Sequence, residues 1–274
     1  MTGEVKAFGP RLKWWREHRG LSQLGLAGHA DISQRHLSFL ESGRAEPSRE
    51  MVLRLAAVLD LPLRQQNALL LAAGFAPVWR ESDLGSPELA EINRALDHML
   101  AQQEPYPAFV VDRRWNLLRA NASAGNLVAF LLGAAPTGAV NLADALVAPD
   151  VLRPFIANWE DVAVHFLRSV QADALADGTP ETAALLQRLT AYPGVPPLSR
   201  VAPLETHTPV LHIHFRKGET RFSIFTTIAT LGTPQDVTLQ EIRIECFFPS
   251  DAASAQLLRS RAGTRRVDAR LSAT

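Results

Sequence analysis

The sequence has one cysteine and no long hydrophobic run. A single cysteine cannot form an internal disulfide and is too few for a cysteine-based zinc site. We therefore expect Cys246 to be a buried side chain in a strand. No apolar run reaches the roughly 18 residues that cross a bilayer. The first residues, MTGEVKAFGPRLKWW, have no hydrophobic stretch behind their charges. We therefore expect a cytoplasmic protein that does not act at a membrane.

Sequence motifs of common enzymes are also missing. The chain contains no nucleophile elbow, phosphate loop, zincin helix or dinucleotide fingerprint. His212 and His214 form an H-x-H pair, a spacing known in metal sites, and Glu245 lies on a later strand. The better interpretation is that the two histidines are polar residues on a solvent-exposed face of a sheet. Haem ligation through His165 is supported by one histidine only. We expect neither an enzyme nor a metal site.

The composition is that of a globular protein with room for two domains. Of its 274 residues, 47% are hydrophobic and 20% charged, and the formal net charge is zero. Residues 1–80 hold eleven Lys and Arg against seven Asp and Glu, whereas the remaining residues hold seventeen against twenty-one. The positive excess at the N-terminal end favours a polyanionic partner there.

The first eighty residues predict five short helices. Apolar residues recur at helical spacing from Phe8 to Arg19. The later helices are expected to begin after Ser22, Ser33, Ser48 and Pro62, since serine is a good N-cap and proline suits a first turn. Only residues 29–32 separate the second and third helices. This short connection predicts a helix-turn-helix.

Beyond residue 104 the pattern becomes mixed. PAFVVDRRWNLLRAN predicts two strands around a turn at Asp112 and Arg113. The segments PVLHIHFRK, ETRFSIFTTIATL and TLQEIRIECFF predict three more strands, with a hairpin turn at Lys217 and Gly218. Helical segments lie between the two groups. These elements indicate an α+β domain, an antiparallel sheet with helices on one side.

The composition shifts divide the chain into four parts. We expect a helix-turn-helix domain over residues 1–79, a linker and connecting helix over 80–104, an α+β domain over 105–255 and a fraying basic tail over 256–274. The fold class is thus multi-domain, all-α followed by α+β.

The expected third helix has an unusual exposed side. Gln34, Arg35 and Ser38 lie together on adjacent turns, where a solvated helix would normally carry Glu and Lys. Such side chains can read base edges in the major groove, and Phe39 can contact a thymine methyl. The alternative is that the serines are only caps and the polar side is only solvated.

The segment GLSQLGLAGHADISQRHLSFLESGRAEPSREMVLRLAAVLDL resembles the DNA-binding domain of the XRE family, the Cro and lambda-repressor type of helix-turn-helix. Two positions differ from the family pattern. Asp31 stands where Gly or Asn is common and a positive φ is expected, and Gly25 lies inside the second helix.

The DNA partner is expected to be double-stranded. Ser22 and Gln23 open the second helix near a phosphate, and Arg44 and Arg49 are further phosphate contacts. The expected DNA-binding residues are Ser22, Gln23, Ser33, Gln34, Arg35, Ser38, Phe39, Arg44 and Arg49.

The second part, from YPAFVVDRRWNLLRANASAGNLVAFLLG to TLGTPQDVTLQEIRIECFFPSD, resembles the ligand-binding domain of MmyB-like transcription regulators, with a PAS-like sheet. The resemblance implies a dimeric bacterial regulator with a small, largely apolar ligand such as a fatty acid, and no other cofactor. The candidate ligand-binding residues are Trp115, Trp159, His165, Phe166, Arg168, Ile213, Phe215, Phe222 and Ile224. For the aromatic ones, ordinary core packing is the alternative.

Together these features predict a one-component transcription regulator that binds an operator as a homodimer and senses a ligand. The first alternative is a ligand-independent DNA-binding protein whose second domain only dimerises or docks a protein. The second is an enzyme tethered to DNA. Ligand identity, operator sequence and the sign of regulation do not follow from the sequence.

Overall fold

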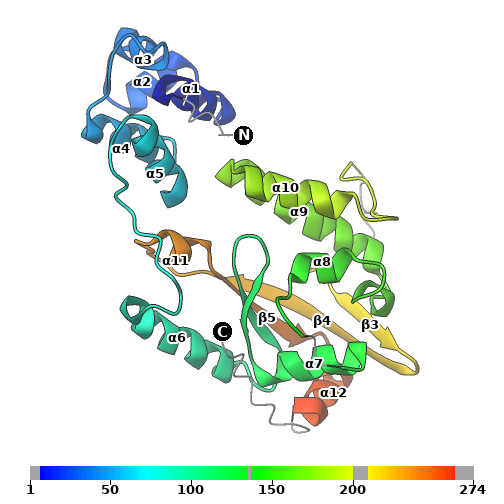
Figure 1. The fold of residues 1–274 in the computed structure, drawn as a ribbon. Helices are drawn as coiled ribbons and strands as arrows, with labels where there is room; N and C mark the ends of the chain where they lie inside the picture. Colours follow the sequence, from blue (N-terminus) through cyan, green and yellow to red (C-terminus); the bar gives the residue numbers. More distant parts are fainter. Residues whose placement is uncertain (1–6, 135–136, 200–208, 263–274) are drawn as a thin grey trace. The chain divides into compact units, whose positions relative to one another are not determined.

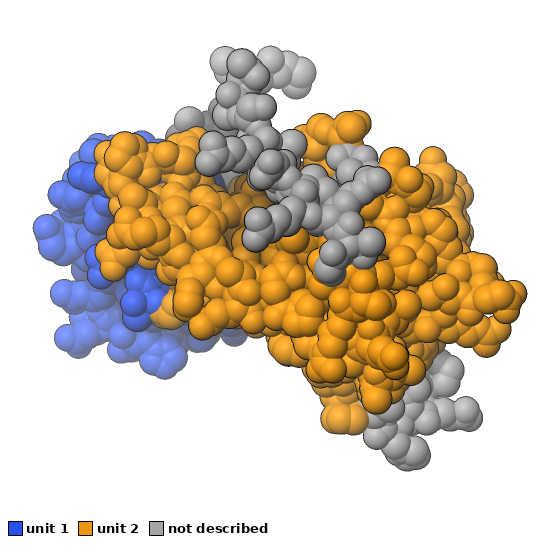
Figure 2. Space-filling model, turned by 90° about the horizontal axis from the view of Figure 1, so that it is seen from below, with its two compact units in different colours: residues 1–82, 233–240 blue, residues 83–232, 241–274 orange. Residues whose placement is uncertain are grey.

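The chain folds into two compact units. The structure is a computed structural model that describes residues 7–134, 137–199 and 209–262. The first unit comprises residues 1–82 with 233–240, and the second comprises residues 83–232 with 241–274 (Figure 2). No helix among the described residues has both the length and the hydropathy needed to cross a membrane.

The first unit contains the five predicted helices (Figure 1). They are α1 Phe8–His18, α2 Gln23–His29, α3 Gln34–Glu41, α4 Arg49–Val58 and α5 Leu63–Ala72. All three predicted serine caps form. Ser22, Ser33 and Ser48 each accept a hydrogen bond from the backbone N–H three residues later, at 3.0, 3.1 and 3.2 Å. The predicted helix starts are therefore confirmed.

The five helices share one hydrophobic core, whose largest fully buried side chains include Trp15, Leu12, Leu26, Leu37, Leu40 and Leu55. Helix α1 approaches the end of α3 very closely at Gly9. A Cβ atom there would lie 2.6 Å from the carbonyl oxygen of Leu40 and nearer still to that of Glu41. Any larger residue at position 9 would push α1 away from α3, the helix that carries the candidate base-reading residues.

The second unit combines a sheet with helices. Its elements are η1 Pro87–Leu89, α6 Ala90–Gln102, β1 Ala108–Val111, β2 Leu117–Ala120, α7 Ala122–Leu132, α8 Leu142–Val147, η2 Arg153–Phe155, α9 Trp159–Asp177, α10 Pro180–Thr190, β3 Ile213–Lys217, β4 Thr220–Ala229, β5 Arg243–Pro249 and α12 Ala252–Ala262. Helix α11, Val237–Glu241, joins β4 to β5, and all of it except Glu241 belongs to the first unit. The five strands form one antiparallel sheet in the order β2-β1-β5-β4-β3. The predicted fold class, all-α followed by α+β, is confirmed.

Cross-strand pairing fixes which side chains share a face of the sheet. Phe215 pairs with Phe222, and Glu245 pairs with Phe109 on one side and Ile228 on the other. Because side chains alternate along a strand, these residues lie on one face, whereas His214 and its partner Ser223 lie on the other. Core residues of α7, α8 and α9 pack against the first face.

Three local predictions need correction. The β3–β4 hairpin turns at Gly218 and Glu219, one residue later than expected, because Lys217 already pairs with Thr220. The residues TLQE belong to helix α11 and not to a strand. Residues 256–262 do not form a fraying tail, because they continue α12, in which Leu258 is buried against the domain core. Residues 263–274 lie outside the described part of the chain.

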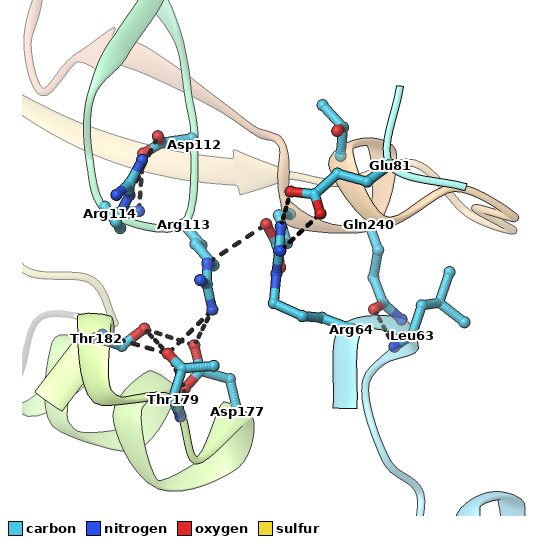
Figure 3. Close-up of polar contacts among 12 residues, drawn as sticks. Leu63, Arg64, Glu81, Asp112, Arg113, Arg114, Asp177, Thr179, Thr182 and Gln240 are labelled. Carbon is cyan, nitrogen blue, oxygen red and sulfur yellow. Dashed lines mark hydrogen bonds and ion pairs between the residues drawn. The ribbon is translucent and has the colours of Figure 1, made fainter. Parts of the chain in front are cut away.

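The connection between β4 and β5 belongs to the first unit. Within that unit, residues 233–240 pair with the segment that follows α5. Val237 N donates to the Arg80 carbonyl at 2.8 Å, and Ser82 Oγ donates to Asp236 Oδ2 at 2.7 Å. Gln240 Oε1 accepts a hydrogen bond from the backbone N–H of Leu63 at 2.7 Å (Figure 3). Pro62 has no side-chain cap to offer α5, so Gln240 supplies this function.

Candidate functional site

The turn between α2 and α3 has the backbone conformation expected of a helix-turn-helix. Asp31 has a φ of 53°, in the left-handed region that Asp tolerates better than most residues. The predicted positive φ is confirmed. The hydrogen bond from Ile32 N to the Ala27 carbonyl, 3.0 Å long, closes the turn and sets the direction in which α3 leaves it.

Helix α3 presents the predicted polar side to solvent. Gln34 and Arg35 are exposed, whereas Ser38 and Phe39 are half-buried. The guanidinium carbon of Arg35 lies 5.3 Å from the centre of the Phe39 ring, and that of Arg44 lies 6.0 Å from it. Both cations thus rest on one aromatic ring, which limits their motion before any partner binds.

The remaining predicted DNA-binding residues lie around this helix. Ser22 and Ser33 use their hydroxyl groups as helix caps. Arg44 and Arg49 are exposed, with Arg49 in the first turn of α4. Arg49 therefore has a free path to a phosphate.

Gln23 has a structural partner that sequence reasoning did not foresee. Its Nε2 donates to Glu41 Oε2 at 2.8 Å, and the same carboxylate accepts two hydrogen bonds from Arg16, at 2.6 and 3.2 Å. Arg16 and Glu41 are 6% and 7% exposed, so this is a buried ion pair. The hydrogen bond from Glu41 raises the pKa of Arg16 further. The pair joins α1, the start of α2 and the end of α3.

The second unit contains an apolar cavity of about 240 Å³, close to the lower end of ligand-pocket sizes, about 300 Å³. It lies between the sheet and helices α7, α8 and α9. Its apolar lining comprises Phe109, Trp115, Val128, Leu142, Leu146, Leu152, Ile156, Val162, Phe166, Leu211, Ile213, Phe215, Ile228 and Phe247. The polar lining residues are His165, Ser169, Thr226 and Glu245. His165 and Ser169 are exposed, so they stand at the rim.

Five of the nine candidate ligand-binding residues line the cavity: Trp115, His165, Phe166, Ile213 and Phe215. The other four do not. Phe222 and Ile224 are buried in the core next to it, and the Phe222 ring stacks on that of Phe215. Trp159 is buried with its Nε1 donating to the Leu146 carbonyl at 2.9 Å, and Arg168 donates to the Leu198 carbonyl.

Glu245 is the one carboxyl group among the lining residues. It is partly accessible and lines the cavity. Burial raises the pKa of Glu245 to about 7, while the Thr226 hydroxyl that donates to it and the nearby charge of Arg243 act in the opposite direction. Arg243 in turn forms an ion pair with Asp173 at 2.5 Å.

Trp115 lines the cavity in a strained conformation. It occupies the β1–β2 turn with a φ of 65°, which costs a bulky residue about 1–3 kcal/mol. The side chain is 4% exposed, its ring meets that of Phe166 edge to face at 4.7 Å, and its Nε1 has no hydrogen-bond partner among the described residues. Asp112 maintains the turn by accepting hydrogen bonds from the backbone N–H groups of Arg114 and Asn116.

The same turn is tied to two other elements of the second unit. The Arg113 guanidinium donates to Thr179 Oγ1 at 3.0 Å and lies 3.3 Å from Asp177 Oδ2, at the end of α9 (Figure 3). Its Nε lies 3.4 Å from Glu241 Oε2, the last residue of α11. A displacement of Trp115 would therefore act on Arg113 and on Glu241.

The H-x-H pair and Glu245 do not converge. His214 lies on the opposite face of the sheet, where its Nδ1 is 2.6 Å from Ser223 Oγ. The His212 and His214 rings are 6.2 Å apart. No group of three metal-ligating side chains occurs within the part of the chain that the structure describes.

Several lining residues were not foreseen, notably Glu245 and Ile228. The alternation along β4 and β5 was visible in the sequence. The sequence did not reveal the strand register, because Glu245 lies opposite Phe109 and Ile228 only when β5 is placed between β1 and β4. Asn121 does not line the cavity and caps α7, because its Oδ1 accepts from Ala124 N at 2.9 Å.

Comparison with known proteins agrees with this architecture. A family model described as helix-turn-helix matches residues 12–66, and one described as MmyB-like transcription regulator ligand binding domain matches residues 92–260. The class is therefore a DNA-binding transcription regulator with a ligand-binding domain. Since the second match covers more than half of the chain, the protein belongs to the MmyB-like family, and both predicted resemblances are confirmed.

Other comparisons add little. No curated protein matches the chain. A solved structure described as an RNA-binding Light-Oxygen-Voltage receptor is 13% identical, with a TM-score of 0.27. That alignment covers 92% of this chain and 61% of the other, so this chain spans less than two thirds of that protein. A likeness at this TM-score supports no inference.

Proposed function

We propose that the protein is a bacterial one-component regulator in which α3 reads operator bases and the cavity of the second unit binds a small, largely apolar molecule. Binding of that molecule changes the affinity for the operator. The observation that carries the proposal is the apolar cavity between the sheet and α7–α9, because a domain that only dimerises needs no such space. A fatty acid is one ligand that the family resemblance suggests.

The exposed residues of α3 support base reading. Gln34 offers a donor and an acceptor, and Arg35 offers a forked guanidinium, the chemistry that distinguishes base pairs in the major groove. Arg35 rests on Phe39, which lowers the entropy lost when it docks. Arg44 and Arg49 contact phosphates, and the protein binds as a homodimer with one α3 in each half-site.

The β4–β5 connection supports a route from cavity to DNA. Thr226 and Ile228 of β4 and Glu245 and Phe247 of β5 line the cavity. Residues 233–240, which join these strands, belong to the first unit and cap α5 there through Gln240. A ligand that shifts β4 against β5 changes the position of this segment. The two α3 helices of a dimer then meet both half-sites or fail to do so.

The DNA claim is tested by selecting operators from random DNA with the full chain, then measuring binding by fluorescence anisotropy at fixed salt. Arg35→Ala should reduce the ratio of operator to random-DNA affinity about 10- to 100-fold, because one specific base contact is lost. Arg54→Ala removes an exposed charge from α4 and should leave the ratio unchanged. Equal losses on both DNAs after Arg35→Ala would contradict base reading.

The ligand claim is tested by native mass spectrometry of the purified protein, followed by denaturing extraction of whatever is bound. A co-purified apolar molecule that alters operator affinity in titration supports the sensor. A protein that binds no apolar molecule, with operator affinity unaffected by any, would instead favour a ligand-independent DNA-binding protein whose second unit only dimerises or docks a partner.

A further inference from the structure

The second unit has another hollow, whose polar lining lies on the face of the sheet opposite the apolar cavity. It has a volume of about 470 Å³ and lies at β3 and β4, which form one end of the sheet (Figure 1). Its polar lining residues are Asn158, His214, Arg216, Arg221 and Ser223, and the others are apolar. The described residues that line it include no aspartate or glutamate. The hollow is therefore electropositive.

Two arginines of this hollow lie directly opposite each other. Arg216 of β3 pairs with Arg221 of β4, and His214 pairs with Ser223, so the four side chains project from one face. Like charges at opposite positions on neighbouring strands are destabilising, because their Cβ atoms are about 5 Å apart. Among the described residues neither guanidinium has a hydrogen-bond or ion-pair partner, and the nearby turn residue Glu219 pairs with neither. The fold thus places two positive charges side by side without a counter-ion.

The other polar groups of the hollow are held in place by the protein. His214 Nδ1 lies 2.6 Å from Ser223 Oγ, which orients the imidazole and leaves its Nε2 without a partner among the described residues. Asn158 fixes the backbone of β3, because its Oδ1 accepts from His214 N at 3.0 Å and its Nδ2 donates to the His212 carbonyl at 2.7 Å. These groups need little rearrangement to meet an anion, which lowers the entropy lost on binding.

Helix α9 begins at the wall of the hollow. Asn158 is its N-cap residue, but the side chain makes no capping bond because it is bonded to β3. The first N–H groups of this 19-residue helix therefore lack a side-chain cap, and the positive end of its dipole lies next to Ala157 and Asn158 of the hollow. Glu160 and Asp161 of the first turn offset part of this charge, but neither lines the hollow. A helix N-terminus beside two arginines favours an anion.

We infer that this hollow binds the phosphate group of a small molecule, either free phosphate or a phosphate monoester, between the guanidinium groups of Arg216 and Arg221. A guanidinium can form two parallel hydrogen bonds to phosphate, and a phosphate monoester carries close to two negative charges near neutral pH. One such group offsets both arginine charges, whereas a monocarboxylate offsets only one. The site is separate from the apolar cavity, so the inference does not depend on the ligand proposed for that cavity.

The test is isothermal titration calorimetry of the full chain at pH 8 and fixed ionic strength, with inorganic phosphate, adenosine monophosphate, adenosine and acetate as separate ligands. The two phosphates should bind with a Kd of about 1 mM or less, and acetate at least about tenfold more weakly. Adenosine lacks the phosphate and should not compete with it. Tighter binding of adenosine monophosphate than of inorganic phosphate identifies a monoester as the natural ligand, and the reverse order identifies the free ion.

Arg216→Gln and Arg221→Gln should each weaken phosphate binding at least about tenfold, because each removes charge-assisted hydrogen bonds. Each also relieves the repulsion between the arginines, so thermal unfolding in phosphate-free buffer should show no loss of stability. The double change Arg216→Lys with Arg221→Lys keeps the charges but removes the forked donors, and should also weaken binding. Arg94→Gln removes an exposed charge from α6 of the same unit and should leave phosphate binding unchanged.

Two results would overturn the inference. Phosphate binding that survives the loss of both arginines, or that is as tight in the double lysine variant as in the unchanged protein, would reflect surface charge alone. Weaker binding of random-sequence duplex DNA by the Arg216→Gln, Arg221→Gln double variant would instead assign the two arginines to the DNA backbone.

Discussion

Arg16 and Glu41 are charged residues held inside the DNA-binding unit. Their ion pair clamps α1 onto the end of α3, and Gln23 adds the start of α2 to the same carboxylate. Gly9 lets α1 come close enough for these bonds to form. The orientation of α3 therefore depends on buried contacts with α1 and with the start of α2.

Removing Glu41 should loosen that orientation. Glu41→Ala leaves the buried Arg16 with only the more exposed carboxylate of Glu17 as an ion-pair partner, so we expect a loss of at most about 3 kcal/mol in the stability of the first unit. Lys13→Ala breaks an exposed pair with Glu17, whose side chains are 56% and 55% exposed, and should cost at most about 1 kcal/mol. Hydrogen exchange of the α1 and α3 amides measures the loss of stability in both variants. Similar protection in the two variants would contradict a structural role for the buried pair.

Glu245 should make the stability of the second unit depend on pH. Its folded pKa, about 7, lies above its ordinary value of 4.5, so the folded state holds the proton more tightly than the unfolded chain. Stability is then greatest below about pH 4.5 and falls as the pH rises to 7, by at most about 3 kcal/mol. Thr226, Arg243 and the rim residue His165 are the polar groups nearest this site.

The measurement is hydrogen exchange of the β1 and β5 amides in urea at pH 5 and pH 8, corrected for the intrinsic rates. Glu245→Gln cannot ionise, so its stability should fall less between the two pH values than that of the unchanged protein. Parallel pH dependence in the two proteins would mean that Glu245 keeps an ordinary pKa.

At the residue scale, rules about neighbouring residues predicted the helix caps but not the contacts between residues far apart in the sequence. The Ser33 cap and the positive φ of Asp31 follow from rules about a few neighbouring residues, and both hold. Trp115 is an exception to these rules. The neighbouring turn residues do not indicate that a tryptophan takes a backbone conformation suited to glycine. The link between Arg16 and Glu41 spans 25 positions and has no local sign.

At the element scale, helix α12 belongs to the folded second unit. Leu258 is buried against α7 and the sheet, and Ser254 Oγ accepts a hydrogen bond from Ser223 N at 2.9 Å. The arginines around these residues made the segment look like a tail. Its two leucines pack inward because α12 follows directly on β5 and lies against β4.

Leu258→Ala should therefore destabilise the second unit by about 2–5 kcal/mol, the usual cost of a cavity in a core. Gln256→Ala, at an exposed position of the same helix, should change stability by less than about 0.5 kcal/mol. Hydrogen exchange of the β4 and α7 amides distinguishes the stabilities of the two variants. Unchanged exchange in Leu258→Ala would show that α12 does not support the sheet in solution.

The five helices of the first unit could be placed from the sequence because each has its own apolar stripe and because α2, α3 and α4 each begin after a capping serine. The sheet could be placed only in part. TLQE has the alternation of a strand, yet it forms α11, because Asp236 Oδ1 accepts from the Thr238 N–H at 2.9 Å and starts a helix. The cavity could not be located, since it depends on the order of strands that lie far apart in the chain.

At the scale of the whole molecule, the proposed route from ligand to DNA predicts a role for Gln240. It caps α5 of the first unit, and its neighbour Glu241 meets Arg113, next to the turn that carries Trp115. Gln240→Ala should leave the affinities for operator alone and for the co-purified apolar molecule alone within about twofold, while reducing the effect of that molecule on operator binding. The coupling is a separate free energy and can be lost by itself.

Anisotropy titrations of operator binding with and without the co-purified apolar molecule measure this coupling. Gln187→Ala, at an exposed position of α10, is the control and should keep the full effect. A Gln240→Ala protein with undiminished coupling would rule out the β4–β5 connection as the route.

The cap that Gln240 provides also determines when the DNA-binding unit can finish folding during synthesis. The N–H of Leu63 and the side chain of Gln240 are 177 positions apart. During synthesis from the N-terminus, the core of α1–α5 can assemble long before its last hydrogen bonds exist. The DNA-binding unit is complete only after β4 and the β4–β5 connection have left the ribosome, so an interrupted chain lacks the cap on α5.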